Sequence, residues 1–419
     1  MTHTEKTTNA DASVPSAFAL PVFIREILAR FDYAGYEAFC VGGCVRDTLR
    51  GVEPHDWDLC TSALPDQTAA LFSDKPCLDI GIRHGTLTVM WDGIPVEITT
   101  YRTEGAYVGH RAPSSVTFTP SLRQDCLRRD FTVNAMAYHP TVGLRDFFGS
   151  ADDLRAGRLR CVGNPGERFD EDALRILRAL RFSSTLDFDI EPATADALHT
   201  CAPLLAQISG ERILSEFRRM LTGVRAASLL SDFADVIGVF YPPLAGCAGQ
   251  TDRLQTVFTQ CRTEQTRLAA ALCLCGCTDE TAVRKTLSHL PTERSFLDGI
   301  TSLVNHAAQT PPDSKAAMRR RMSEKSVPQI TEQLALHAAL FPEHADTCAN
   351  AAALCAEIAA AGEVTRISQL AVNGRDLTAL GFRGRAVGAA LQSLLDAVID
   401  EKTENTRKDL LSYAGTLLS

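Results

Sequence analysis

The sequence predicts an α+β protein in which a small mixed sheet with helices is followed by an all-helical remainder. Strand-like apolar runs are confined to the first part of the chain, where Asp92-Gly93 is a strong signal for a two-residue hairpin turn. From Asp152 onward strand patterns nearly vanish, and helical patterns punctuated by prolines replace them. Glycines and paired carboxylates stand together between Gly42 and Asp58, which places the chemistry in the sheet-containing part.

Local signals predict each element of this first part. Pro21 is favourable at the start of a helix, an apolar stripe reaches Phe31, and Gly35 ends the pattern. The further elements expected are a strand over 39–41, a helix from Pro65 to Phe72, a strand over 86–91, a return strand over 94–101 and a strand over 116–119.

The turn after the first strand has the composition of a phosphate-binding turn. Gly42 and Gly43 follow the apolar run, and Arg46 lies in the first turns of the helix expected next. Glycines let the backbone approach a phosphate closely, while N–H groups at a helix start and an arginine face it. We therefore expect the backbone of this turn and Arg46 to face a phosphate.

Two acids follow Arg46 at strand spacing. Because side chains alternate along a strand, Asp56 and Asp58 are expected to point one way while Trp57 and Leu59 point into a core. Two carboxylates this close repel unless a cation lies between them, and Mg²⁺ takes one or two carboxylates together with substrate phosphates. The alternative is a polar turn with two surface acids.

Glu97 is a candidate third carboxylate. On the return strand it shares a face with Thr99 and Tyr101, which would place it beside the acid pair. The alternative is an ion pair with Arg83 or Arg102 that supports the scaffold. After this strand, residues 102–119 are rich in Gly, Arg and polar side chains and are expected to form a mobile loop that gates a site, followed by the strand over 116–119.

A second dense motif, LRRDFTVNAMA, covers residues 127–137. Arg128 and Arg129 are suited to phosphates, and Asp130, with Asn134 nearby, is suited to a ribose hydroxyl. The alternative is a surface ion-pair cluster. Its position after the first motif favours the nucleotide interpretation.

The helical remainder begins with a third group of charged residues. Asp170-Glu171-Asp172 is expected to start a helix that runs to Phe182. Arg175, Arg178 and Arg181 recur every three residues along it, and Asp172 is expected to share a face with Arg175.

Two later stretches are candidates for RNA contact. Residues 315–325 form the clearest basic cluster, and residues 372–391 combine glycines and arginines in a turn before a helix. Such a turn can receive an RNA phosphate; the alternative there is a plain helix–turn–helix.

Composition limits the class of protein. A chain of 419 residues allows two to four domains, and 45% hydrophobic with 22% charged residues is ordinary for a soluble globular protein. The net charge of −9 argues against a sequence-blind RNA coat, so RNA binding requires local positive charge. Without a secretory or membrane-spanning apolar run, the 14 cysteines indicate reduced thiols in a cytoplasmic protein. Cys273, Cys275 and Cys277 invite a metal interpretation, but no second Cys/His pair stands at zinc-site spacing, so we interpret them as small buried residues.

Taken together, the motifs resemble those of the DNA polymerase β-like nucleotidyltransferase superfamily, and within it the class II tRNA nucleotidyltransferases, or CCA-adding enzymes, and the related bacterial poly(A) polymerases. The resemblance runs from about Pro21 to Leu411. It is strongest in five segments: GGCVRD…DWD (42–58), RHGTLTV…VEITTYR (83–102), LRRDFTVNAMA (127–137), EDALRILRALRF (171–182) and SGERILSEF (209–217).

The resemblance implies a role for each candidate. Asp56 and Asp58 would hold Mg²⁺ for two-metal phosphoryl transfer, with Glu97 orienting the nucleophile or completing a coordination shell. The tRNA 3′ end would attack CTP or ATP without a nucleic-acid template. The implied nucleotide-binding residues are Gly43, Arg46, Arg129, Asp130, Asn134, Asp172, Arg175, Arg178 and Arg181.

Asp172 and Arg175 would read the base. Cytosine and adenine both present an amino donor beside a ring-nitrogen acceptor, which suits one carboxylate and one guanidinium. Uracil and guanine present a carbonyl at the amino position and would oppose the carboxylate with an acceptor, which is costly in a desolvated site.

The same resemblance implies a division of the chain and leaves a competing function. The expected parts are a flexible N-terminus (1–20), a nucleotidyltransferase head (21–150), a helical neck that reads the base (151–220), a helical body (221–310) and a tRNA-binding tail (311–419). The competitor is a poly(A) polymerase or an enzyme that adds only part of CCA. His84-Gly85-Thr86, VEITTYR, the 102–113 loop and the lack of a Lys/Arg-rich C-terminal extension favour CCA addition.

Overall fold

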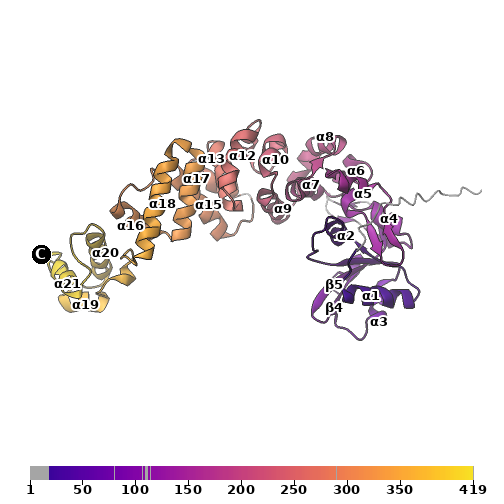
Figure 1. Cartoon of the computed structure of the whole chain (residues 1–419), viewed down its shortest axis with the longest axis horizontal. Coiled ribbons are helices and arrows are strands. Elements are labelled where there is room, and N and C mark those ends of the chain that lie inside the picture. Colours follow the sequence, from indigo (N-terminus) through magenta and orange to yellow (C-terminus); the bar gives the residue numbers. More distant parts are fainter. Residues whose placement is uncertain are drawn as a thin grey trace, which may run out of the picture. The chain divides into compact units, whose positions relative to one another are not determined.

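The computed structural model describes residues 18–418, apart from 80, 106, 109–111, 114 and 289. The chain divides into two compact units (Figure 1). The first extends through Leu229 and includes Asp235–Phe240, whereas the second contains Leu230–Ala234 and continues from Tyr241. The mixed sheet lies in the first unit, and the α+β class is confirmed.

A seven-stranded sheet organises the first unit, in the order β11-β10-β1-β2-β5-β4-β3. Its neighbouring strands are antiparallel except for β2 and β5, which run parallel. The strands are β1 (Ala38–Val41), β2 (Asp58–Thr61), β3 (Cys77–Leu78), β4 (Thr86–Trp91), β5 (Ile94–Thr100), β10 (Ala137–His139) and β11 (Gly143–Arg145). The predicted hairpin between β4 and β5 is confirmed, since Asp92 and Gly93 both have the positive φ that such a turn requires.

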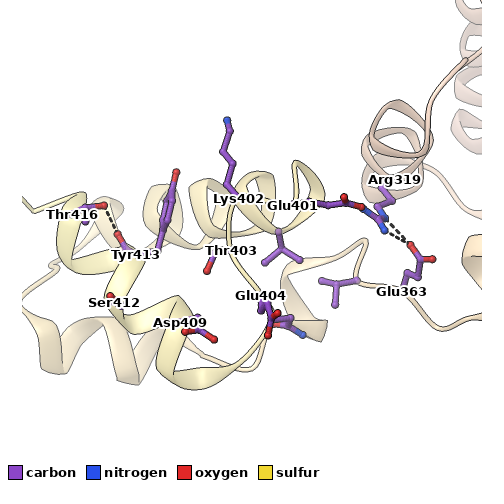
Figure 2. A pocket seen from close by; sticks show the side chains of 13 residues that line it. Arg319, Glu363, Glu401, Lys402, Thr403, Glu404, Asp409, Ser412, Tyr413 and Thr416 are labelled. Carbon is purple, nitrogen blue, oxygen red and sulfur yellow. Dashed lines mark hydrogen bonds and ion pairs between the residues drawn. The ribbon is translucent and has the colours of Figure 1, made fainter.

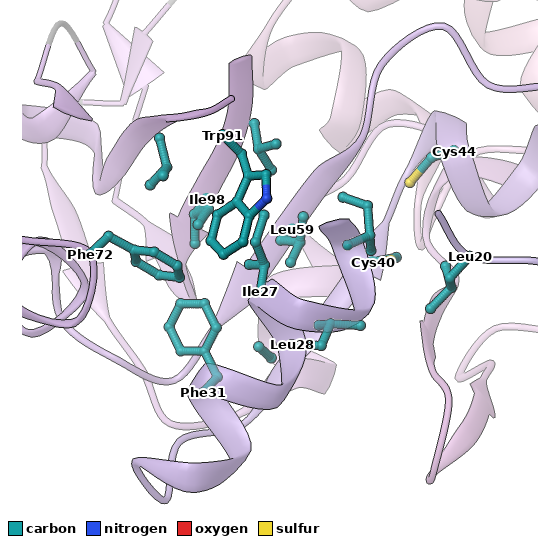
Figure 3. Packing of buried hydrophobic residues seen from close by; sticks show 14 of the residues in the cluster. Leu20, Ile27, Leu28, Phe31, Cys40, Cys44, Leu59, Phe72, Trp91 and Ile98 are labelled. Carbon is teal, nitrogen blue, oxygen red and sulfur yellow. The ribbon is translucent and has the colours of Figure 1, made fainter. Parts of the chain in front are cut away.

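One face of the sheet is covered by α1 (Val22–Tyr33), which buries the predicted apolar stripe, and by the segment around α3 (Pro65–Leu71) (Figure 3). Phe31 and Phe72 pack there at 5.5 Å between ring centroids, near Trp91. The packing begins before the expected helix start, because Leu20 is buried in this cluster and Phe18 stacks on Tyr138. Residues 1–17 of the expected flexible N-terminus lie outside the described residues.

The opposite face is covered at one end only. Tyr101 and Cys60 are buried there with Cys126, which belongs to α4 (Leu122–Leu127). Glu97 lies on the same face as Tyr101, because side chains alternate along the strand. This face is buried at Tyr101 and becomes exposed towards Glu97. The uncovered end of this face is where the predicted acids lie.

The segment predicted as a mobile loop contains strands. The strand β6 (Arg102–Glu104) pairs with β9 (Val116–Phe118), which confirms the strand expected near 116–119. Between them β7 (Tyr107–Val108) pairs with β8 (Ala112–Pro113). Antiparallel pairing provides hydrogen-bond partners for backbone groups that would face solvent in a loop. The composition of the segment did not reveal this pairing, because it joins residues that are not adjacent in the sequence.

Helices and two short strands complete the first unit, with α9 packed along α7. The remaining elements up to the unit boundary are η1 (Ile82–His84), α2 (Gly43–Leu49), η2 (Thr132–Asn134), α5 (Ser150–Arg155), β12 (Arg158–Leu159), α6 (Pro165–Glu171), α7 (Leu174–Leu186), β13 (Asp189–Ile190), α8 (Pro192–Cys201), η3 (Ala202–Gln207), α9 (Gly210–Thr222), α10 (Ala226–Asp232) and α11 (Ala234–Gly238).

The expectation that Asp170-Glu171-Asp172 starts a helix is wrong. These residues close α6, and Asp172 is extended (φ −132°, ψ 102°) before α7 begins at Leu174. The Asp172 side chain accepts a hydrogen bond from the backbone N–H of Leu174 at 3.1 Å and so satisfies one donor in the first turn of α7, whose N-cap residue is Ala173. Acidic residues are common at the start of a helix, but here a helix that begins at Pro165 already contains the first two of them.

The second unit is built from helices; across the described residues no strand follows Ile190. Its helices are η4 (Pro242–Cys247), α12 (Thr251–Gln260), α13 (Glu264–Leu274), α14 (Glu280–Leu287), α15 (Arg294–Ala307), α16 (Lys315–Glu324), α17 (Val327–Leu340), η5 (Pro342–His344), α18 (Ala345–Ala360), η6 (Ile367–Gln369), α19 (Gly374–Leu380), α20 (Arg385–Ile399) and α21 (Arg407–Thr416). No helix in the described part of the chain is long and apolar enough to cross a membrane.

The basic cluster on α16 is largely neutralised within this unit. Arg319 pairs with Glu363 at 2.6 Å and with Glu401 at 3.0 Å, and Lys315 pairs with Glu363 at 2.6 Å. A hollow of about 990 Å³ lies beside these pairs, lined also by residues before and along α21 (Figure 2). The cluster therefore holds α16 to its neighbours, and its arginines are not a bare positive surface.

Candidate active site

The acids of the first unit lie at the uncovered end of the sheet. Asp58 opens β2 and is the register partner of Glu97 on the parallel strand β5. Register partners on neighbouring strands project from the same face, so the two carboxylates lie side by side. Asp56 precedes the strand and is exposed, whereas the prediction placed both aspartates within it. Trp57 packs against the core and Leu59 is buried in it, as predicted.

Electrostatics confirm that these acids are neighbours. Burial raises the pKa of Asp58 to about 6, and the charges of Glu97 and Asp56 act in the same direction, while Arg129 opposes them. The carboxylate is accessible to solvent at its surface, but the surrounding protein still disfavours its charge. Three acids with only one opposing arginine make a site that favours a cation.

The glycine turn lies against Arg129. Gly42 precedes α2 with a φ of +80°, and a Cβ atom there would stand 3.4 Å from Nη1 of Arg129. A Cβ on Gly43 would stand 3.6 Å from Nη2 of Arg46. Because both residues are glycines, the backbone of the turn lies directly beside two guanidinium groups, as a phosphate-binding turn requires.

Asp125 holds Arg129 in place. It is fully buried, and its Oδ2 lies 3.3 Å from Nη2 of Arg129. Burial raises the pKa of Asp125, but Arg129 and Arg128 outweigh it and hold this pKa below its usual value. Burial likewise opposes the charge of Arg129, and Asp125 outweighs it, so the pKa of Arg129 is raised. Both groups therefore stay charged.

A chain of hydrogen bonds joins the first and second motifs. Arg46 donates to both carboxylate oxygens of Asp47 at 2.8 Å and to Oδ1 of Asn134 at 2.7 Å. Asn134 donates to Asp130 at 3.2 Å, and Arg178 donates to the other oxygen of Asp130 at 2.9 and 2.6 Å. All of these candidate residues are thus brought together in one network.

Asp130 is 9% exposed and remains ionised in this network. Burial raises its pKa, but the charge and hydrogen bonds of Arg178, with those of Asn134 and the Phe131 backbone, lower it to about 2. The same pairing outweighs the burial of Arg178, whose pKa is raised. Arg178 therefore links α7 to the motif that contains Asp130.

Three arginines surround the ring of Phe182. The guanidinium carbon of Arg181 lies 4.0 Å from the ring centroid, that of Arg178 lies at 5.3 Å and that of Arg46 at 5.4 Å. Glu216 on α9 pairs with Arg181 at 2.8 Å, yet burial still lowers the pKa of Arg181 to about 10. Phe182 thus provides a shared support for arginines from α2 and α7.

Asp172 and Arg175, which were predicted to share a helix face, have different side-chain partners, although the backbone N–H of Arg175 donates to the Asp172 carbonyl at 2.9 Å. Asp172 accepts from Nη2 of Arg212 at 3.0 and 3.3 Å. Arg175 is buried, pairs with Glu171 at 2.6 Å and donates to the Arg128 carbonyl at 3.0 Å. Asp172 is extended and lies before α7, so the two side chains do not share the face of one continuous helix as predicted.

Sequence reasoning assigned no role to several residues that the structure places in the site. Arg212 and Glu216 belong to α9 and to the quoted SGERILSEF segment, and Phe182 ends the EDALRILRALRF segment. Their membership in these motifs was the available signal. Asp125 stands three and four residues before Arg128 and Arg129, a spacing that allows ion pairs, whereas its complete burial depends on α4 packing against the sheet.

The donor set fits a divalent cation. Oxygen ligands from Asp56 and Asp58 are those that a hard cation prefers. Burial, and after it the charges of Glu97 and Asp56, raise the pKa of Asp58, and a bound cation would stabilise the charged form that they disfavour. In the described part of the chain, no three His, Cys, Asp or Glu side chains form a complete metal site. Substrate oxygens or water would have to supply the other ligands.

The mixed sheet, its acidic end and the adjoining arginines define a nucleotidyltransferase. Residues 38–160 match the family model of the Poly A polymerase head domain, 187–234 match an RNA and SrmB-binding site of polymerase A, and 260–414 match domain 2 of tRNA nucleotidyltransferases. The CCA-adding enzyme of Limosilactobacillus fermentum is 35% identical over 94% of this chain and 96% of its own. The chain belongs to the family of CCA-adding enzymes, a family that is generally dependent on divalent metals.

Further relatives match nearly the whole length of this chain. The CCA-adding enzyme of Enterococcus faecalis is 35% identical over 96% of this chain and 97% of its own. The solved structure of the Bacillus stearothermophilus CCA-adding enzyme in complex with CTP is 30% identical, covers 94% of this chain and 96% of its own, and has a TM-score of 0.79. The Thermotoga maritima CCA-adding enzyme complexed with tRNA, at 20% identity and a TM-score of 0.65, shares the fold.

Proposed function

We propose that this chain adds CMP and AMP from CTP and ATP to the 3′ end of tRNA, without a nucleic-acid template. The observation that supports this most directly is the register of Asp58 with Glu97 beside the Gly42 turn and Arg129. It joins a cation-favouring acid cluster to a phosphate-binding turn. The relative from Bacillus stearothermophilus, whose structure was solved with CTP, has the same fold at 30% identity.

Asp56 and Asp58 would hold Mg²⁺ at the open end of the sheet. When bound, divalent ions lower the pKa of the attacking hydroxyl and neutralise charge on the leaving pyrophosphate. Glu97, as the register partner of Asp58, is placed to orient the RNA 3′-hydroxyl or to add a ligand oxygen. The oxygen of that hydroxyl attacks the α-phosphorus, the bond to the pyrophosphate oxygen breaks, and the hydroxyl proton is lost.

Arg129 and the backbone at Gly42 and Gly43 would contact the triphosphate. Arg46 is oriented by Asp47 and Asn134, so its guanidinium does not have to be ordered when the nucleotide binds. Asp130 would accept from a ribose hydroxyl, which favours ribonucleotides. Arg178 and Arg181, stacked about Phe182, would complete a positive wall along the nucleotide.

Asp172 and Arg175 would select the base. A carboxylate offers about four acceptor positions, so Asp172 can accept from a base amino group while Arg212 and the Leu174 N–H remain bound. Arg175 is held by Glu171, and its donation to a ring nitrogen requires that it share or exchange this contact. Arg212 would keep the Asp172 carboxylate turned in one direction, which makes it a positioning residue.

The family resemblance suggests how the rest of the chain serves this reaction. We assign residues 21–150 to the nucleotidyltransferase head, 151–220 to a neck that reads the base, 221–310 to a helical body and 311–419 to a tail that binds tRNA. The Gly/Arg-rich turn within 372–391 supports the last assignment, because Gly384 has a positive φ directly before α20 and several arginines flank it.

The decisive experiment supplies a tRNA that lacks its 3′ end with CTP alone, ATP alone, or both. Successive addition of C, C and A with both nucleotides is expected, and addition should stop after two C residues with CTP alone. Long A tails would identify a poly(A) polymerase, and addition of A or of two C residues only, even with both nucleotides, would identify a partial enzyme. The Asp56→Ala variant serves as the inactive control.

A further inference from the structure

Two thiols in the second unit lie in direct contact. The sulfur atoms of Cys247 and Cys275 are 3.3 Å apart, in a chain whose fourteen cysteines are all free thiols. A disulfide needs a separation of about 2.05 Å, so the sulfurs would have to approach by only about 1 Å. Cys247 ends η4 and Cys275 follows α13, so each lies at the end of an element, where backbone adjustment disturbs few hydrogen bonds.

A glycine makes this approach possible. A Cβ atom on Gly246 would stand 3.3 Å from Sγ and 3.4 Å from Cβ of Cys275, closer than most real contacts. Any larger residue at this position would press on Cys275 and displace its sulfur. The short distance between the thiols is therefore part of how η4 packs against α13, which contact each other directly.

The two sulfurs differ in accessibility. Cys247 is fully buried, whereas Cys275 is partly exposed beside the exposed Gly276. A small oxidant therefore reaches Cys275 first, and Cys247 is already in place to react with the oxidised sulfur. The hydrogen bond from the Cys247 thiol also lowers the pKa of Cys275, which increases its reactive thiolate fraction.

The alternative of a metal site is not supported. The CxCxC pattern of Cys273, Cys275 and Cys277 suggested ligands, but no three such side chains in the described residues are grouped to hold a metal. Cys275 faces Cys247 across the η4–α13 contact, which leaves a two-thiol pair and not a three-thiolate site.

We propose that Cys247 and Cys275 are an oxidative modification site, at which a hydroperoxide converts the two thiols into an intrachain disulfide. The Cys275 thiolate attacks one peroxide oxygen, forming an S–O bond and breaking the O–O bond, so that a sulfenic acid forms and hydroxide leaves; the hydroxide takes up the proton that the Cys275 thiol had lost and becomes water. The Cys247 sulfur then attacks the Cys275 sulfur, forming the S–S bond and releasing the hydroxyl with a proton as a second water. The peroxide is reduced by two electrons and the thiol pair is oxidised by two.

The test treats the full-length reduced protein with hydrogen peroxide, blocks the remaining thiols by alkylation, and digests it with trypsin without reduction. Cys247 lies in the peptide 226–253, and Cys275 shares the peptide 268–284 with Cys273 and Cys277. Mass spectrometry is expected to find these two peptides linked, with a loss of two of the fourteen thiols that dithiothreitol restores.

Serine variants assign the link. It should be lost in Cys247→Ser and in Cys275→Ser and retained in the matched controls Cys273→Ser and Cys277→Ser. The same treatment in urea should scramble the links if folding, and not sequence, creates the pair. The proposal is overturned if the native protein yields no linked peptide, or if the link survives in Cys275→Ser.

Discussion

Nη2 of Arg212 donates hydrogen bonds to both carboxylate oxygens of Asp172. The two residues are forty positions apart in the sequence, and the contact joins α9 to the junction between α6 and α7. The other terminal nitrogen, Nη1, is buried and has no hydrogen-bond partner among the described residues. The Asp172 carboxylate is therefore held by a residue from another helix, whereas the sequence spacing predicted only that Asp172 shares a helix face with Arg175. If Asp172 selects the base, the selection depends on this interhelical contact.

Replacing Asp172 by Ala is expected to relax base choice more than it slows phosphoryl transfer. The carboxylate that rejects a base carbonyl is lost, and a mispaired hydrogen bond costs about 1–3 kcal/mol, roughly a 5- to 150-fold change in discrimination. The measurement is the ratio of kcat/KM for CTP or ATP to that for UTP or GTP. An unchanged ratio would remove the base-selecting role.

Arg212→Met should shift the same ratio in the same direction by a smaller amount, because Asp172 stays present but loses its fixed orientation. Arg212→Lys keeps the charge but cannot hold the carboxylate through a planar guanidinium, so it should rescue the ratio only in part. A loss of activity with the ratio intact would assign Arg212 a purely structural role.

Replacing Asp56 by Ala is expected to lower nucleotide incorporation by about 10³-fold or more, since metal-ion stabilisation of such a transition state amounts to several kcal/mol. Affinity for tRNA, measured by filter binding, should change little. The control is Glu53→Ala, which removes an exposed acid from the same loop. Robust incorporation by the Asp56 variant would contradict the metal assignment.

Phe182→Leu should raise the KM for both nucleotides by about 10-fold while changing kcat less. The ring supports three guanidinium groups, and each such contact contributes about 0.5–1 kcal/mol or more when desolvated. Phe188→Leu is the matched control, because Phe188 is also buried and, among the described residues, has a single guanidinium over its ring, that of Arg50 at 5.4 Å. Equal KM values for the two variants would speak against the shared support.

Gly42→Ala should impair both stability and catalysis. A φ of +80° is strained for alanine by about 1–3 kcal/mol, and the new methyl group would stand 3.4 Å from Nη1 of Arg129, in the space beside the turn. Gly35→Ala imposes a similar φ of +77° with nothing within 4 Å of the new atom. We expect comparable losses of thermal stability but a clear loss of kcat/KM only at Gly42, measured by steady-state kinetics.

Acid should destabilise the first unit partly through Asp130. Its pKa is lowered to about 2 from the unfolded value of about 3.9, so its contribution is present above about pH 4 and is lost as the pH falls towards 2. The contribution is on the order of 2 kcal/mol. Urea unfolding between pH 5 and 2.5 should show a shallower decline for Asp130→Asn than for wild type. Asp152→Asn, at an exposed position, should follow the wild type.

Local sequence was sufficient where a residue's role depends on its neighbours along the chain. The α1 stripe, the hairpin at Asp92-Gly93 and the glycine turn before Arg46 were all predicted and are present. Glu97 was placed on the face of Tyr101 by alternation, and its register with Asp58 follows that prediction.

Only the tertiary structure decided which charged groups from distant segments meet. The sequence determined the α+β class, the acids, the glycines and the arginines, because strand and helix periodicities and turn residues act over a few positions. It could not place Arg212 on Asp172 or Arg178 on Asp130, because these partners lie 40 and 48 residues apart and meet only through the packing of distant segments. An arginine has a long side chain with several donors and can reach many different acceptors, and the packing of the core determines which acceptor it contacts.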